Sequence, residues 1–154
     1  MKPSFTQRGG GWVLAQGLLI SAVLIAGPSL AVQPGPGALR AVGGLLLAVG
    51  AGFGIAGVVA TGRQLTAFPK PPEGSVLIQH GIYRYARHPL YASVMALAWG
   101  WGLMWGSGVA LAAAGLLTGL LYFKARREER WLRAQFPGYA DYERRVRRFV
   151  PGVV

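Results

Sequence analysis

Three long runs without a charged residue place the strongest constraint on this chain. They cover residues 9–39, 41–62 and 88–123. About 20 apolar residues in a helix cross the roughly 30 Å hydrocarbon core of a bilayer, so each run is long enough for at least one crossing. Only 14% of the residues are charged, against roughly 25% in an average soluble domain. The 154-residue chain is therefore predicted to form a single membrane-embedded domain.

The first two runs predict one transmembrane helix each. Residues 12–32 form the core of the first helix and residues 41–62 the second, with a proline-containing turn at residues 33–37 between them. A cleaved signal peptide is the alternative for the first run, because a basic leader precedes it and Ser29-Leu30-Ala31 resembles a cleavage site. The run is longer than the apolar core of a usual signal peptide, which favours the transmembrane helix.

The glycines of the second run allow two interpretations. Gly52, Gly54 and Gly57 fit the spacing of a dinucleotide-binding loop, but that motif needs a preceding strand and a βαβ unit, and neither is predicted. Gly50 and Gly54 instead fit a small-residue face on which transmembrane helices pack closely. The sequence favours this packing face.

The third run is too long for one crossing. A helix of its 36 residues would be about 54 Å long. Gly106-Ser107-Gly108 interrupts it near the middle and predicts a hairpin of two short spans, residues 89–105 and 109–123. The expected fold is an all-α, polytopic membrane bundle of about four transmembrane helices.

Residues 124–148 carry most of the charge and predict a C-terminal amphipathic helix on the cytoplasmic membrane face. Its apolar stripe consists of Trp131, Leu132 and Phe136. Such a helix lies in the headgroup region of anionic lipid. Pro137-Gly138 breaks it, and residues 139–148 predict a short final helix.

The distribution of basic residues predicts the orientation. Four crossings put both termini on one side, which would hold 15 of the 16 lysines and arginines and leave only Arg40 on the other. The positive-inside rule makes the richer side cytoplasmic. The basic residues that give the net charge of +11 lie beside the apolar runs. This arrangement favours anionic lipid as a partner and disfavours nucleic acid. The loop of residues 63–87 and the C-terminal tail then meet on the same face.

One stretch, residues 80–91, holds both histidines, three tyrosines and two arginines. Pro89 predicts the first residue of the third transmembrane helix and places His88 at its mouth. The partial positive charge of a helix N-terminus, with Arg87 beside it, suits an anionic group. The acid pair at residues 128–129 would face the same loop. The absence of cysteine, with only two histidines, argues against a metal site.

These residues resemble a known family. Gly81-x-Tyr83-x-x-x-Arg87-His88-Pro89-x-Tyr91 is followed by Glu128-Glu129-x-x-Leu132-x-x-x-Phe136, by Tyr139-x-x-Tyr142 and by a basic run to Pro151. The pattern resembles the isoprenylcysteine carboxyl methyltransferases, which are related to the phospholipid N-methyltransferases, and covers roughly residues 65–151. The resemblance implies an integral-membrane methyltransferase that holds S-adenosylmethionine (SAM) at the cytoplasmic face. Residues 1–62 would supply two scaffold spans, and residues 63–154 the cofactor loop, the helical hairpin and the basic tail.

The resemblance also implies the site residues. Cofactor-binding positions would be Ser75, Val76, Leu77, Ile78, Tyr83, His88, Pro89, Leu90 and Tyr91, together with one of Glu128 and Glu129. Arg126 matches the arginine that faces the substrate, and Arg87 is the second candidate catalytic residue. No metal is implied.

The implied chemistry suits a chain in which no nucleophile or triad is predicted. Methyl transfer from SAM is an in-line displacement that requires positioning and exclusion of water more than acid–base chemistry. The acceptor would be a lipophilic small molecule or lipid-modified group that enters from the bilayer. Its reacting atom, whether of a carboxylate as in prenylcysteine, an amine, a thiol or a hydroxyl, stays open, as does the oligomeric state. Two alternatives remain: a non-catalytic membrane interaction or scaffold protein with this fold, and a phospholipid-binding protein that uses the basic tail.

Overall fold

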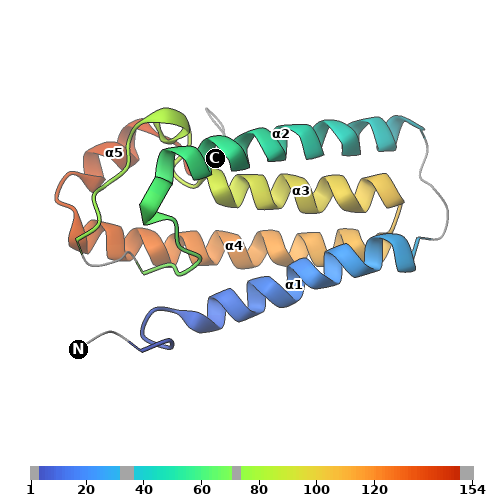
Figure 1. Cartoon of the computed structure of the whole chain (residues 1–154), viewed down its shortest axis with the longest axis horizontal. Coiled ribbons are helices and arrows are strands. Elements are labelled where there is room, and N and C mark those ends of the chain that lie inside the picture. Colours follow the sequence, from blue (N-terminus) through green and yellow to red (C-terminus); the bar gives the residue numbers. More distant parts are fainter. Residues whose placement is uncertain (1–3, 32–36, 71–73, 150–154) are drawn as a thin grey trace.

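Helices make up the regular structure of the chain (Figure 1). The computed structural model describes residues 4–31, 37–70 and 74–149, and these ranges contain no strand. The helices are α1 (Gly10–Ser29), α2 (Gly37–Thr61), α3 (Pro89–Trp105), α4 (Gly108–Gln135) and α5 (Tyr139–Arg145), with 3₁₀ turns at Gly62–Gln64 and Gly81–Arg84. The all-α prediction is confirmed. The predicted turn at residues 33–37 lies, apart from Gly37, outside the described residues, as does Pro151.

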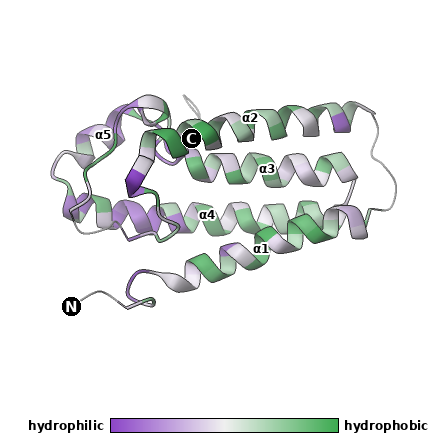
Figure 2. Ribbon diagram, in the orientation of Figure 1, coloured by the Kyte–Doolittle hydropathy of each residue, from purple (hydrophilic) through white to green (hydrophobic). Residues whose placement is uncertain are grey.

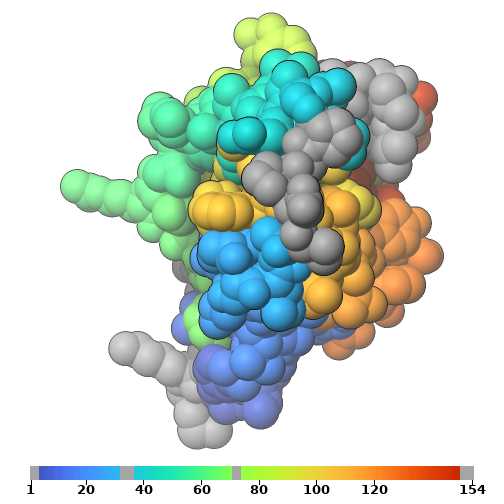
Figure 3. All heavy atoms as spheres, turned by 90° about the vertical axis from the view of Figure 1, so that its right-hand side faces the viewer, coloured from blue at the N-terminus to red at the C-terminus, as the bar shows by residue number. Residues whose placement is uncertain are grey.

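Three helices are long and apolar enough to cross a membrane: α1, α2 with its extension to Gln64, and α4. The fourth predicted span is α3, which has 17 residues. It lies alongside α2 and α4 in the ribbon view (Figure 1). Viewed from the end of the bundle, α3 separates α2 from α1 (Figure 3). By length and composition, the structure therefore supports three crossings of the membrane. That α3 makes a fourth crossing stays a prediction.

Small residues bring α2 and α3 close together. A Cβ atom at Gly50 would lie 2.9 Å from Cγ of Leu97, and one at Gly43 would lie 2.9 Å from the carbonyl oxygen of Gly100. The hydroxyl of Ser93 donates a 2.6 Å hydrogen bond to the carbonyl oxygen of Gly50. The predicted packing face is confirmed. The dinucleotide-loop interpretation is wrong, because its glycines lie within one continuous helix.

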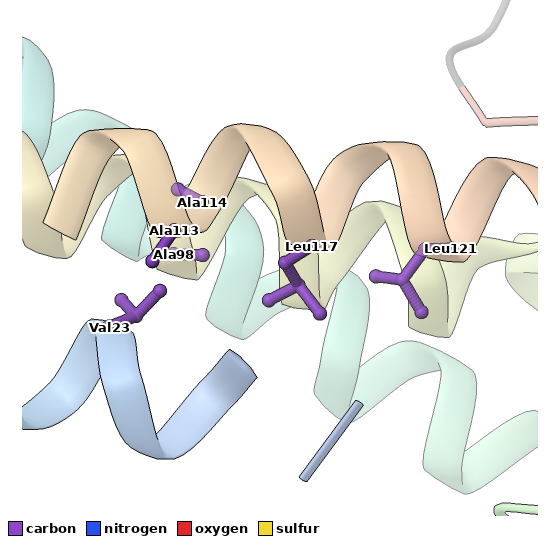
Figure 4. Close-up of a cluster of buried hydrophobic side chains, with 6 residues drawn as sticks. All are labelled: Val23, Ala98, Ala113, Ala114, Leu117 and Leu121. Carbon is purple, nitrogen blue, oxygen red and sulfur yellow. The ribbon is translucent and has the colours of Figure 1, made fainter. Parts of the chain in front are cut away.

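The hydrophobic core lies between α1, α3 and α4 (Figure 4). It consists of Val23 from α1, Ala98 from α3, and Ala113, Ala114, Leu117 and Leu121 from α4. Ser107 ties the predicted hairpin to α1, because its hydroxyl donates to the carbonyl oxygen of Ala26 (2.8 Å) and also caps α4 by accepting from the N–H of Ala110. Gly106 makes the preceding turn with φ of 63°, a conformation that favours glycine. The core therefore makes α1 an integral part of the bundle.

The charged end of α4 differs from the prediction. The expected span 109–123 and the amphipathic segment beginning at Lys124 form one continuous helix as far as Gln135. Residues 120–135 contain neither glycine nor proline and are rich in strong helix formers, so the start of the charged sequence does not end the helix. The chain leaves the helix at Phe136, directly before Pro137.

The final helix is shorter than the predicted 139–148. It ends at Arg145, because the residues that follow pair with the start of α3. The carbonyl oxygen of Arg147 accepts a hydrogen bond from the N–H of Arg87 (2.9 Å), and that of Arg148 accepts one from the N–H of His88 (2.8 Å). This pairing brings the C-terminal tail to the predicted cofactor loop.

Candidate functional site

The polar end of the bundle, coloured purple around α5 in Figure 2, contains a cavity between the loops and the ends of α2, α3 and α4. Its volume is about 130 Å³. It is lined by Thr61, Gln64, Leu65, Thr66, Phe68, Ser75, Val76, Leu77, Ile78, Tyr83, Arg87, His88, Leu90, Tyr91, Glu128, Leu132, Phe136, Tyr139 and Tyr142. We call it the tyrosine pocket, because four tyrosines line it.

The tyrosine pocket brings together most of the residues that the sequence singled out. Among the predicted cofactor-binding positions, those that line it are Ser75, Val76, Leu77, Ile78, Tyr83, His88, Leu90, Tyr91 and Glu128. Pro89 and Glu129 are not among its lining residues. The wall formed by residues 64–68 was not predicted, because these residues carry no motif. Tyr139 and Tyr142 belong to the family pattern, but no role was predicted for them.

His88 lies at the start of α3, as predicted. Pro89 is the first residue of α3. The imidazole of His88 is buried and stacks on the ring of Tyr91, with centroids 5.3 Å apart and planes 4° apart. Its two nitrogens face the two acids of α4: Nδ1 lies 3.8 Å from Glu128 and Nε2 lies 3.3 Å from Glu129, without alignment for a hydrogen bond. The imidazole of His88 therefore lies between the carboxylates of Glu128 and Glu129.

Glu128 presents its carboxylate to the tyrosine pocket. The hydroxyl of Tyr91 donates a 2.7 Å hydrogen bond to Oε2 of Glu128. Among the lining residues in the described chain, Glu128 is the only acid. It is therefore the group in the pocket best suited to receive a cation or a hydroxyl.

Glu129 does not line the tyrosine pocket and is only 1% exposed. Arg148 binds its carboxylate through two hydrogen bonds of 2.9 and 2.8 Å. A third contact comes from Arg87, whose Nη2 lies 3.0 Å from Oε1 of Glu129. Bidentate arginine pairs are strong and geometrically specific. Glu129 thus holds the start of α3 and the C-terminal tail against α4.

Glu143 of α5 extends this network to the surface. Arg133 binds its carboxylate with two hydrogen bonds of 2.8 and 2.6 Å, and Nη1 of Arg87 lies 3.0 Å from Oε1. These contacts, chiefly the hydrogen bonds from Arg133, hold the pKa of the Glu143 carboxyl below its usual value, although partial burial opposes them. Arg87 therefore connects the buried Glu129 to Glu143.

The lowered pKa of Glu143 predicts a contribution to stability that depends on pH. This contribution is present above the unfolded pKa, about 4.3 for glutamate, and is lost as the pH falls through the lower folded value. We expect Glu143→Gln to lower the free energy of unfolding at pH 7 by about 1 kcal/mol, since the pair is partly exposed. Thermal unfolding in detergent between pH 7 and 3 should show the difference from wild type shrinking with acid. If the Tm of the variant and of wild type differed by the same amount at every pH, the predicted contribution of Glu143 would be wrong.

The two predicted catalytic arginines lie apart. Arg87 lines the tyrosine pocket, whereas Arg126 is exposed and does not line it. Arg126 instead borders a cavity of about 580 Å³, here called the basic cavity. The basic cavity is lined by Trp12, Phe123, Arg126, Glu129, Arg130, Arg133 and Arg148. The structure therefore does not bring Arg126 into the pocket with the predicted cofactor residues.

A third cavity, the apolar groove, lies within the bundle. Its volume is about 350 Å³. It is lined by Ile20, Val23, Leu24, Leu47, Val94, Leu97, Ala98, Trp101 and Leu117, from α1, α2, α3 and α4. Val94 lies one helical turn along α3 from Leu90, which lines the tyrosine pocket. The apolar groove thus begins close to the polar site.

Three buried polar atoms in lining residues of the tyrosine pocket lack a hydrogen-bond partner in the described chain: Nε of Arg87, Nε2 of His88 and the hydroxyl of Tyr139. Burial and the nearby Glu129 carboxylate raise the pKa of Tyr139 well above its ordinary value, so its hydroxyl keeps its proton. Unpartnered buried polar groups are costly and call for a partner. These unpartnered donors suit acceptor atoms of a polar ligand, whereas Glu128 and the aromatic faces suit a positive charge on it. Among the described residues, no group of three or more metal-ligating side chains is found.

Comparisons with known proteins identify a family and a relative. The sequence model of the phospholipid methyltransferase family matches residues 39–138, more than half of the chain. The cobalt-zinc-cadmium resistance protein CzcN of Cupriavidus metallidurans is 35% identical over 80 residues. That match covers 51% of this chain and 37% of CzcN, so the chain spans little more than a third of that relative. The family match includes α3, α4 and most of the tyrosine pocket, and it excludes α1.

Proposed function

Because the chain belongs to the phospholipid methyltransferase family, we propose that it is an integral-membrane enzyme that uses SAM to methylate a lipophilic acceptor. The tyrosine pocket is the observation that carries the proposal. It combines one carboxylate, four tyrosines and unpartnered buried donors at the polar end of a bundle of apolar helices. Members of the family generally use SAM.

Each part of the tyrosine pocket has a role in this proposal. Glu128, oriented by Tyr91, accepts hydrogen bonds from the ammonium or ribose hydroxyls of SAM. Arg87 and the N-terminus of α3 favour its carboxylate. The tyrosine rings stabilise a cationic centre and, with Leu77 and Ile78, exclude water. When bound, SAM supplies a methyl group on a sulfonium, already activated for displacement.

The apolar groove supports a lipophilic acceptor. All of its lining residues are apolar or aromatic, and it approaches the tyrosine pocket where Val94 follows Leu90 on α3. We propose that the apolar chain of the acceptor lies in this groove and presents its reacting group near Tyr91. A carboxylate, as in prenylcysteine, is the first candidate for that group. This arrangement would let the acceptor arrive from the bilayer and SAM from the aqueous side.

The proposed topology has four crossings, with α3 as the fourth and both termini in the cytoplasm. It is supported by the concentration of lysine and arginine at the end that carries the tyrosine pocket. Arg126 and Arg130 of the basic cavity would face anionic lipid there. Since the chain has no cysteine, a single cysteine introduced at Arg144 would test the orientation through its reaction with a membrane-impermeant reagent.

Titration of SAM into the detergent-solubilised protein tests the proposal. We expect saturable binding and a raised Tm, with a stabilisation of about 2.7 kcal/mol when SAM is at about 100 times its Kd. ATP, which shares the adenosine but lacks the sulfonium and the amino acid, is the control ligand and should not bind. Incubation with methyl-labelled SAM and a membrane extract should then label an organic-soluble product.

Absence of binding at millimolar SAM would overturn the proposed function. Binding without transfer to any lipid-soluble or lipid-modified fraction would instead support the non-catalytic scaffold alternative.

A further inference from the structure

Lys124 of α4 is fully buried, with an exposed fraction of 0%. Its Nζ donates to Oε1 of Gln16 on α1 at 2.5 Å and to the carbonyl oxygen of Ala67 at 2.9 Å. It also lies 5.2 Å from the centre of the Tyr91 ring. Burial of a lysine is costly unless its charge is well partnered. The partners of Lys124 are therefore important, and they lie on α1 and in the segment after α2.

Ala67 belongs to one wall of the tyrosine pocket. Its neighbours Thr66 and Phe68 both line the pocket. Gln64 ends the 3₁₀ turn after α2, and the rest of the wall, residues 65–68, has no regular secondary structure. The hydrogen bond from Lys124 thus fixes a segment that backbone pairing within a helix or sheet does not hold.

The N-terminal segment before α1 holds the same wall from another direction. The guanidinium of Arg8 lies 3.9 Å from the ring centre of Phe68. The ring of Phe5 packs edge-on against Phe68, with centroids 5.7 Å apart. Together with Gln16, these contacts place α1 and its leader against a wall of the tyrosine pocket.

Lys124 also lies near the polar residues of the tyrosine pocket. It lies one helical turn before Glu128 on α4. Its ammonium approaches the ring of Tyr91. The hydroxyl of the same tyrosine donates a hydrogen bond to Glu128. One side chain therefore binds α1 and the Thr66–Phe68 wall, and it approaches the ring of Tyr91.

We propose that Lys124 is a positioning residue that, together with Gln16, holds the Thr66–Phe68 wall against Tyr91 and so sets the shape of the tyrosine pocket. The part of this inference that concerns SAM affinity rests on the proposed function. It also gives α1, which lies outside the segment matched by the family, a direct part in the site. Lys124 need not touch the cofactor to act in this way.

Lys124→Met is the first test, because methionine keeps much of the buried volume and removes the charge. We expect the Kd for SAM to rise by at least about tenfold, as loss of a hydrogen bond from a charged donor allows. Deuterium exchange of the peptide containing residues 65–70 should speed up at the same time. The Tm without SAM should stay within a few degrees of wild type or rise, because a buried charge is removed. A merely structural lysine would instead lower the Tm.

Arg127→Met is the matched control. Arg127 is exposed on the same helix, and its guanidinium lies 4.9 Å from the ring centre of Trp131. It should leave SAM binding and the exchange of residues 65–70 unchanged. Gln16→Leu, a milder change in α1, should raise the Kd by about threefold, and should add little to Lys124→Met because the two residues act through one contact.

Two results would overturn the proposal: wild-type affinity and exchange in Lys124→Met, or wild-type values in Gln16→Leu if Lys124→Met does not fold. The exchange measurement needs no cofactor. A wild-type protein that fails to bind SAM would therefore count against the proposed function, whereas the exchange of residues 65–70 would still decide whether Lys124 holds the wall.

Discussion

Glu128→Gln is expected to weaken SAM binding by about a hundredfold while the helical bundle keeps its Tm, since hydrogen bonds to a charged group contribute about 1.5–3 kcal/mol each. Glu128 is the only acid among the described residues that line the tyrosine pocket, and its carboxylate is already oriented by Tyr91. Glutamine keeps the size of the side chain but loses the negative charge. Titration of SAM into both proteins measures the effect.

Tyr91→Phe is the matched variant for this prediction. It keeps the ring that stacks on His88 and removes the hydroxyl that orients Glu128. We expect a loss of about tenfold, smaller than that of Glu128→Gln, because the charge remains. A folded Glu128→Gln protein with wild-type affinity would remove Glu128 from the site.

The start of α3 could be predicted from sequence because its cause is local. Proline suits the first turn of a helix and disfavours helical conformation in the residue before it. The helix indeed begins at Pro89, with His88 in a non-helical conformation. The packing face around Gly50 was predictable for the same reason, since small residues at helical spacing suffice to bring two helices together.

The choice between Glu128 and Glu129 could not be made from sequence. Neighbouring residues on a helix point about 100° apart, so the rotation of α4 decides which acid faces the pocket. That rotation is set by tertiary contacts, which include the core packing of Leu117 and Leu121 and the two hydrogen bonds from Arg148 to Glu129. The burial of Lys124 could not be predicted for a related reason. A lysine beside other charges predicts an interfacial side chain, and its burial depends on two acceptors that are distant in the sequence, Gln16 and the carbonyl oxygen of Ala67.

The largest effect on stability is expected from Glu129→Gln. This carboxylate, 1% exposed, is bound by Arg148 and Arg87 and lies beside His88. Its removal would leave the partly buried Arg148 without its carboxylate and Arg87 with Glu143 alone, and loss of one partner of a buried ion pair typically costs about 3–5 kcal/mol. Thermal unfolding in detergent should therefore show a large fall in Tm. Limited proteolysis should cut faster near Arg147, because the tail loses its anchor on α4.

A second substitution distinguishes a stabilising role of Glu129 from a role in cofactor binding. Adding Arg148→Met to Glu129→Gln removes the uncompensated charge and should recover part of the lost Tm, since the two residues form one contact. Glu143→Gln, in the more exposed part of the network, should cost much less. If Glu129→Gln instead kept the wild-type Tm and lost SAM binding, Glu129 would be the glutamate that contacts the cofactor, and the assignment of that role to Glu128 would be wrong.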